Sequence, residues 1–183
     1  MKNYQECLTF IQSDYYRYHG YIPSSVFNIY LYSIKNHCFR YQLWLRLSSV
    51  KGFLYPICKV MHLILTRKYG IEIARDTQIG YGLYIGHGFG LVVNSTAIIG
   101  NNCNLSQGVT IGSNHNHAAI IGDNVYVGPS VCIVENVKIG DNVTIGAGAV
   151  VTKDILCGMT VAGVPATVIS SKEPARYIKN QWK

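Results

Sequence analysis

The sequence predicts a mainly β protein, a β-helix of six-residue repeats that follows an α-helical N-terminal segment. Aliphatic residues recur every six positions between Ile73 and Val151, a second apolar register lies four positions further on, and glycine repeatedly follows the first register. A repeat of this length is typical of a solenoid, in which each short strand buries its apolar face only against the next coil. A helix is disfavoured, because glycine at every turn would weaken it by about 1 kcal/mol per residue.

The six-residue repeat is interrupted twice. Eight residues rather than six separate Ile85 from Val93, and ten separate Ile111 from Ile121. Insertions in a solenoid become loops on its surface, often on the binding face. Both insertions contain histidine, so we expect a functional site at these loops.

Residues 1–70 lack the repeat and place apolar residues three and four apart, for example in segments 26–32 and 39–47. This spacing predicts two or three short amphipathic helices, with a start after Pro23 and a break at Lys51 and Gly52. The apolar stretch 52–65 is too short to cross a membrane. We expect the helices to cap the solenoid, with peripheral contact to a membrane surface as the alternative. Residues 71–168 then form the β-helix, and 169–183 form a C-terminal tail.

The composition gives little support for nucleic-acid binding. The formal charge is +7, but only 14% of the 183 residues are charged, and no nucleic-acid-binding motif accompanies the excess.

The six cysteines are scattered without paired spacing, and no signal peptide is recognisable. We therefore expect reduced thiols and a cytoplasmic location, at the inner face of the membrane if the helices contact lipid. No third ligand accompanies His115 and His117, so we expect no metal site.

Several motifs resemble one known family, namely segments 71–73, 79–80, 86–90, 108–112, 145–151 and 161–166. Segment 161–166, with the sequence VAGVPA, is the most specific of them. Together they resemble the hexapeptide-repeat acyltransferases of the serine acetyltransferase branch, over roughly residues 35–170. The resemblance implies a left-handed parallel β-helix, a homotrimer, and acetyl-CoA as co-substrate, bound in the cleft between neighbouring prisms.

The resemblance also implies the catalytic residues. His87 matches the general base of the family, and a neutral imidazole suits the removal of a hydroxyl proton at cellular pH. Glu72 matches the family's acidic partner, which is usually Asp. Fifteen residues separate Glu72 from His87, close to one coil of three hexads, so the two can lie on adjacent coils. The carboxylate would then orient the imidazole ring.

Further positions match the family's binding residues. His117 matches a loop histidine that contacts the acceptor. The cofactor arm is expected along the glycine-rich coils, with a lysine near a phosphate. The matching residues are Gly128, Gly146, Ala147, Thr152, Pro165 and Lys172.

Two differences from serine acetyltransferases bear on the acceptor. Those enzymes have Asp before the catalytic histidine and Arg before the loop histidine, whereas this chain has Gly86 and Asn116, which the resemblance places with His117 at the acceptor. Each lost charged contact to serine is worth about 1.5–3 kcal/mol. The N-terminal helical part is also about half the family's length, and the C-terminal Ile that docks to cysteine synthase is absent, so no such docking is expected.

We therefore expect an acetyl-CoA-dependent O-acetyltransferase of polysaccharide biosynthesis, similar to those of capsule, colanic acid and O-antigen pathways. Its acceptor would be a small-molecule or lipid-linked sugar. Serine O-acetylation for cysteine biosynthesis is the alternative. A non-catalytic solenoid scaffold is the alternative of another class.

Overall fold

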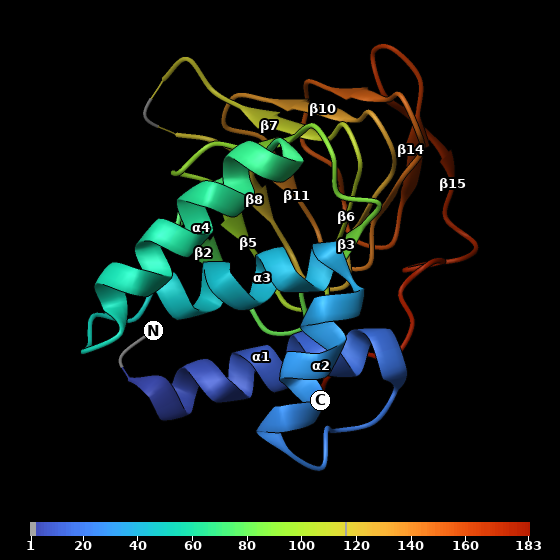
Figure 1. The fold of residues 1–183 in the computed structure, drawn as a ribbon. Coiled ribbons are helices and arrows are strands. Elements are labelled where there is room, and N and C mark those ends of the chain that lie inside the picture. Colours follow the sequence, from blue (N-terminus) through green and yellow to red (C-terminus); the bar gives the residue numbers. More distant parts are fainter. Residues whose placement is uncertain (1–2, 116) are drawn as a thin grey trace.

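The computed structural model describes residues 3–115 and 117–183, in which helices are followed by a parallel β-helix (Figure 1). The helices are α1 (Tyr4–His19), α2 (Val26–Lys35), α3 (His37–Ser48) and α4 (Tyr55–Tyr69). In these ranges there are four helices rather than two or three. Ser25 caps α2 through its side chain, which accepts from the Asn28 N–H, as expected for the start after Pro23.

The strands form three sheets, which are the faces of a prism. Face A contains β1 (Ile71–Ile73), β4 (Leu91–Val93), β7 (Thr110–Gly112), β10 (Cys132–Val134) and β13 (Val150–Val151). Face B contains β2 (Gln78–Ile79), β5 (Ile98–Ile99), β8 (Ile120–Ile121) and β11 (Lys138–Ile139). Face C contains β3 (Tyr84–Gly86), β6 (Asn104–Ser106), β9 (Tyr126–Val127), β12 (Thr144–Ile145), β14 (Thr160–Ala162) and β15 (Thr167–Ser170). Consecutive coils pair in parallel, and β15 then turns back antiparallel to β14.

The pairing confirms both predicted insertions. Val92 pairs with Thr110, eighteen residues further on, as three hexads require. Ile71 pairs with Leu91 after twenty residues, and Thr110 pairs with Cys132 after twenty-two. The extra residues therefore leave the prism as loops, while the strands on either side keep their register.

Both predicted apolar registers supply the core of the β-helix. Ile85, Ile111 and Val131 are at most 1% exposed and belong to one continuous apolar cluster. Burying each such side chain contributes about 1.5–3 kcal/mol. Phe89 also falls on a register, yet it is 55% exposed, because the first insertion carries it out of the prism.

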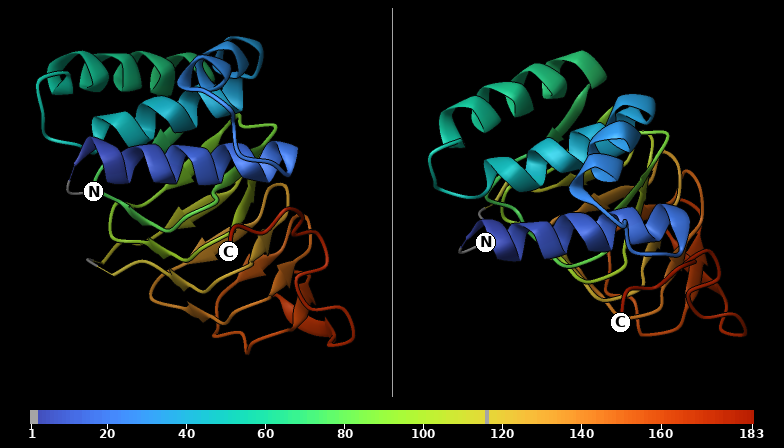
Figure 2. Two further views of the ribbon diagram at one scale, coloured as in Figure 1. Left: turned by 90° about the horizontal axis from the view of Figure 1, so that it is seen from below. Right: turned by 60° about the horizontal axis from the view of Figure 1, so that its bottom comes forward.

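The helices cap the N-terminal end of this core (Figure 2). Tyr41 and Leu45 of α3, with Leu65 and Tyr69 of α4, join the same apolar cluster as the coils. The first coil has no preceding coil to pair with its backbone, and buried unpaired backbone groups are costly. Side chains of α1 and α3 take that place.

Several of these backbone groups have side-chain partners. The Tyr41 hydroxyl accepts from the Ile73 N–H at 3.1 Å, and the Asp14 carboxylate accepts from the Leu83 N–H at 2.8 Å. Arg46 donates to the carbonyls of Ile79 and Gly80 at 2.9 and 2.8 Å. The polar face of the helical cap thus replaces a missing coil.

The C-terminal tail folds back along face C toward α1 (Figure 1). Asn102 exchanges two hydrogen bonds with the Trp182 backbone, at 2.8 and 3.1 Å. Arg17 of α1 donates to the Lys179 carbonyl at 2.9 Å. Face C is therefore covered by the chain itself, whereas outward residues of faces A and B, such as Val92 and Ile98, stay exposed.

Candidate functional site

The turns from face C to face A lie above one another and form one edge of the prism, here called the His87 edge. It consists of residues 87–90, 107–109, 128–131 and 146–149. Residues 163–166, which join β14 to β15 within face C, continue this edge, because the Val150 N–H donates to the Gly163 carbonyl and the Ala166 N–H donates to the Val150 carbonyl. Backbone hydrogen bonds join successive turns: Gly108 N–H donates to the Phe89 carbonyl, and Gly148 N–H donates to the Pro129 carbonyl. His87 therefore lies at one end of a continuous backbone ridge.

The turn that carries His87 is held in place by the core of the β-helix and by helix α3. His87 is exposed and has a left-handed φ of 52°, which is uncommon for a residue with a side chain. The next residue, Gly88, donates its N–H to the Cys38 sulfur of α3 at 3.1 Å. A Cβ at Gly88 would lie 2.6 Å from Ile85 and 2.9 Å from Ile71, so only glycine fits there.

A second histidine, His37, lies beside this turn, and the sequence offered no signal for it. Its ring is 4.9 Å from that of Phe89 and 5.3 Å from that of Tyr69. Burial, aided by the charges of Arg40 and His87, lowers the pKa of His37. Helix α3 therefore places a weakly basic imidazole beside the turn that carries His87.

Glu72 lies on the outer side of face A, in β1, where it is exposed and pairs with Val92 of β4. No hydrogen bond or ion pair joins Glu72 to His87 in the part of the chain that the structure describes. The pairing of this carboxylate with the imidazole stays a prediction.

His117 lies on a different edge, because its insertion connects β7 on face A to β8 on face B. The base of this loop is held by Glu135, which the sequence analysis did not single out. Its carboxylate accepts from the Ser113 hydroxyl at 3.0 Å and from the Asn114 N–H at 3.4 Å. A single chain thus does not bring His117 to His87. The predicted acceptor residue Asn116 lies outside the described residues.

Four of the six predicted cofactor residues lie on the His87 edge: Gly128, Gly146, Ala147 and Pro165. A Cβ at Gly128 would lie 2.8 Å from the Ile145 carbonyl oxygen, so the turns stack closely, whereas Gly148 faces open space. Backbone groups along this edge are therefore exposed and accessible to a thin ligand. Thr152 follows β13 on the opposite side of face A, and Lys172 follows β15 beyond the coils.

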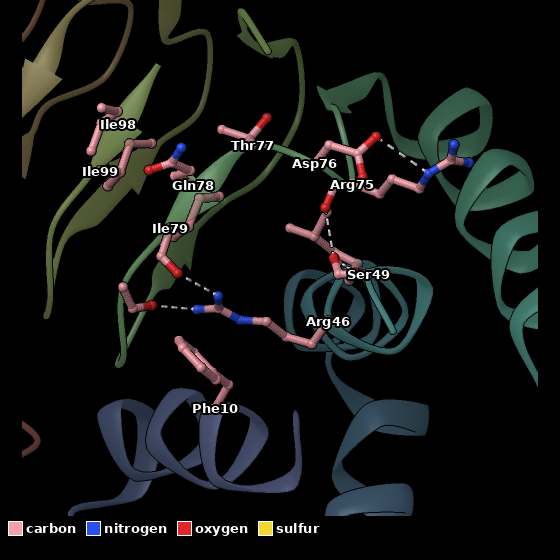
Figure 3. Close-up of a pocket in the computed structure, with 12 residues that line it drawn as sticks. Phe10, Arg46, Ser49, Arg75, Asp76, Thr77, Gln78, Ile79, Ile98 and Ile99 are labelled. Carbon is pink, nitrogen blue, oxygen red and sulfur yellow. Dashed lines mark hydrogen bonds and ion pairs between the residues drawn. The ribbon is translucent and has the colours of Figure 1, made fainter. Parts of the chain in front are cut away.

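A cavity of about 460 Å³ lies between the helical cap and face B, away from His87 (Figure 3). Its charged residue Arg46 is already paired with Asp14 at 2.9 Å and with two carbonyls of the first coil. Arg75 pairs with its neighbour Asp76 at 3.6 Å. We therefore attribute this cavity to the packing of the helical cap on the first coil and do not assign it a catalytic role.

The repeat region matches a known family model. Residues 118–153 match the bacterial transferase hexapeptide family, described as six repeats. These residues form coils of the same β-helix that carries His87, Gly128 and Gly146.

Comparison with individual proteins points to one kind of relative. The chain is 40% identical over 117 residues to serine acetyltransferase 1, chloroplastic, of Arabidopsis thaliana, an alignment covering 61% of this chain and 37% of that protein. It also resembles the solved serine acetyltransferase of Neisseria gonorrhoeae in complex with serine, with 28% identity, a TM-score of 0.74, and coverage of 89% and 69% of the two chains. The Brucella abortus serine acetyltransferase in complex with coenzyme A has 27% identity, a TM-score of 0.72, and coverage of 93% and 69%. The chain spans less than half the length of the curated relatives it matches.

These relatives correct the expected acceptor. The expectation of a carbohydrate is wrong, because the matching proteins are serine acetyltransferases, and one of them was solved with serine bound. The expectation rested on the absence of charge at Gly86 and Asn116. That argument considered only these two positions, whereas α3 also places the ring of His37 against Phe89 in the turn that carries His87.

Proposed function

We propose that the protein is an acetyl-CoA-dependent serine O-acetyltransferase in which His87 is the general base. The observation that carries this proposal is the His87 edge, where an exposed histidine lies at one end of a glycine-rich backbone ridge. Four residues that match the cofactor-binding positions of serine acetyltransferases lie on that ridge. The likeness to solved structures that contain serine and coenzyme A supports the same reading.

In this proposal His87 first accepts a proton from the acceptor and then returns it to the leaving group. The neutral imidazole accepts the proton of the serine hydroxyl as the oxygen attacks the thioester carbonyl. A carbon–oxygen bond forms and the carbon–sulfur bond breaks. The imidazolium then returns the proton to the departing thiolate. The backbone ridge holds the pantetheine arm, and the loop that carries His117 contacts the acceptor.

Our proposal includes a homotrimer, because one chain leaves its two candidate histidines on different edges of the prism. Faces A and B carry exposed apolar residues, among them Val92, Ile98 and Ile120, at 38–39% exposure. Packing of these faces against neighbouring prisms would bury them. It would also bring the His117 loop of one protomer toward the His87 edge of the next. The site is then shared between protomers.

The direct test is thiol release from acetyl-CoA with L-serine as acceptor. We expect turnover by the wild-type protein and a loss of about 10²- to 10⁴-fold in His87→Ala. The circular dichroism spectrum should be unchanged, because the His87 side chain is exposed. The matched control is His115→Ala, an exposed loop histidine to which no role is assigned. Full activity in folded His87→Ala would contradict the role of that residue, and failure of the wild-type protein to acetylate L-serine would contradict the proposed acceptor.

A further inference from the structure

One side of α4 is apolar, exposed and unexplained by the fold. Cys58, Leu65 and Tyr69 face inward and are buried. The opposite side, here called the α4 outer face, consists of Phe53, Leu54, Ile57, Val60, Leu63 and Ile64, which are 45–95% exposed. Phe53, just before the helix, is 95% exposed. Contiguous apolar surface of this kind marks a site of protein or membrane contact.

The α4 outer face has basic residues around it. Lys59 and Lys68 border it on either side of the helix, Arg67 lies at its C-terminal end, and Lys51 precedes Phe53; all four are exposed. Residues spaced three and four apart share a helical face, so Lys59 is beside Leu63, and Lys68 is beside Ile64.

The surrounding sequence contains no acidic residue. Between Asp14 and Glu72 there are eight Lys and Arg residues and no Asp or Glu. From residue 72 to 183 the counts are seven basic and seven acidic residues, so that region is formally neutral. The positive charge of the chain therefore lies in the helical cap, and α4 lies at the outer edge of that cap in both views of Figure 2.

We propose that the α4 outer face binds peripherally to an anionic lipid bilayer. An apolar helix face bordered by Lys and Arg is the pattern of an interfacial helix, whose apolar side enters the boundary between headgroups and acyl chains. An anionic surface complements the net positive charge of the cap. The helix lies along the membrane: α4 has 15 residues, about 22 Å of helix, and within residues 3–115 and 117–183 no helix is long and apolar enough to cross a bilayer.

A vesicle assay tests this proposal. The full chain is sedimented with vesicles of phosphatidylcholine alone or with about one third phosphatidylglycerol. We expect binding to the anionic vesicles, weakening with added salt. The variant Ile57→Asp with Ile64→Asp should bind at least tenfold less. Lys59→Gln with Lys68→Gln should bind about 25-fold less. The matched control is Ile169→Asp, on β15, where the side chain is 64% exposed; it should bind like the wild type.

The same variants separate lipid from protein as the occupant. Each is checked for fold by circular dichroism and for particle mass by light scattering. Absence of binding to anionic vesicles, or binding that the α4 variants do not weaken, would overturn the proposal. A wild-type protein that ignores vesicles, with a particle mass that drops in Ile57→Asp with Ile64→Asp, would assign the face to a second copy of the chain instead.

Discussion

At the residue scale, the geometry around His87 depends on the glycine that follows it. A Cβ at position 88 would overlap Ile85 and Ile71 of the core, and the Gly88 N–H donates to the Cys38 sulfur. The first insertion is therefore a fixed turn, whose backbone is held by the core below and by α3 at its side. A catalytic imidazole gains from such support, because misplacement of a reacting group by about 1 Å costs about 10²-fold in rate.

We predict that Gly88→Ala destabilises the protein by about 1–3 kcal/mol, because the added methyl group overlaps two core side chains. Denaturant unfolding measures this change. The matched control is Gly112→Ala, at the end of β7, where a Cβ would meet its nearest neighbour at 3.7 Å. Equal stability of the two variants would show that the turn yields easily, and that Gly88 does not position His87.

His62 makes the stability depend on pH. Its Nε2 lies 3.1 Å from the Tyr41 hydroxyl, and burial, with Arg75 nearby, lowers the pKa of His62 to about 4. In the unfolded chain the His62 imidazole has a pKa near 6.5, so as the pH falls it takes up a proton there before it does so in the folded protein. Stability contributed by neutral His62 is therefore fully present above about pH 6.5 and is lost between about pH 6.5 and 4.

We predict that His62→Gln, which cannot titrate in this range, loses about 1–2 kcal/mol less stability than the wild type between pH 7 and 5, a value reduced for the partial exposure of the ring. Unfolding in denaturant at the two pH values measures the difference. Parallel pH dependence of both proteins would contradict the assignment.

At the element scale, the cap and the first coil are joined by a buried ion pair. Asp14 of α1 and Arg46 of α3 are 1% and 3% exposed and form two hydrogen bonds, at 2.9 and 3.0 Å. Burial raises the pKa of Asp14, while Arg46 and the Leu83 N–H act in the opposite direction. Each partner also bonds to the backbone of the first coil, so the pair orients both helices on the β-helix.

We predict that Asp14→Ala or Arg46→Met alone costs about 3–5 kcal/mol, because each leaves a buried charge without its partner. The double variant should cost clearly less than the sum of the two. Thermal or denaturant unfolding of all four proteins completes the cycle. Additive losses would mean that the two residues act independently.

At the scale of the whole molecule, the homotrimer that we propose would complete the active site only between protomers. His87 and His117 occupy different edges of one prism, so a mixed trimer can contain an intact site even when each chain lacks one histidine.

We predict that His87→Ala and His117→Ala are each nearly inactive, and that mixed trimers of the two regain activity. Every cyclic trimer that contains both variants has both histidines in one of its three sites, so the purified mixed species should regain about a third of the wild-type activity. The measurement is thiol release after co-expression and tandem-tag purification of the mixed species. A mixture no more active than its components would contradict the shared site. It would mean either that both histidines act within one chain or that His117 does not belong to the active site.

The sequence by itself determined the repeat, the position of both insertions and the residues of the β-helix core. The physical reason is that a solenoid buries each coil only against its neighbours, so the periodic pattern of Ile85, Ile111 and Val131 specifies the packing locally. The sequence also predicted a helical cap, because residues 1–70 lack the repeat and place apolar residues at helical spacing.

The tertiary structure alone decided what lies around His87. The contacts of His37 and Cys38 with the turn 87–90 join residues about fifty positions apart, and no periodic pattern records such contacts. The same holds for Asp14 and Arg46, whose burial depends on how two helices meet one coil. The expectation of a carbohydrate acceptor rested on two positions, Gly86 and Asn116, whereas charge at an active site is summed over every element that packs against it.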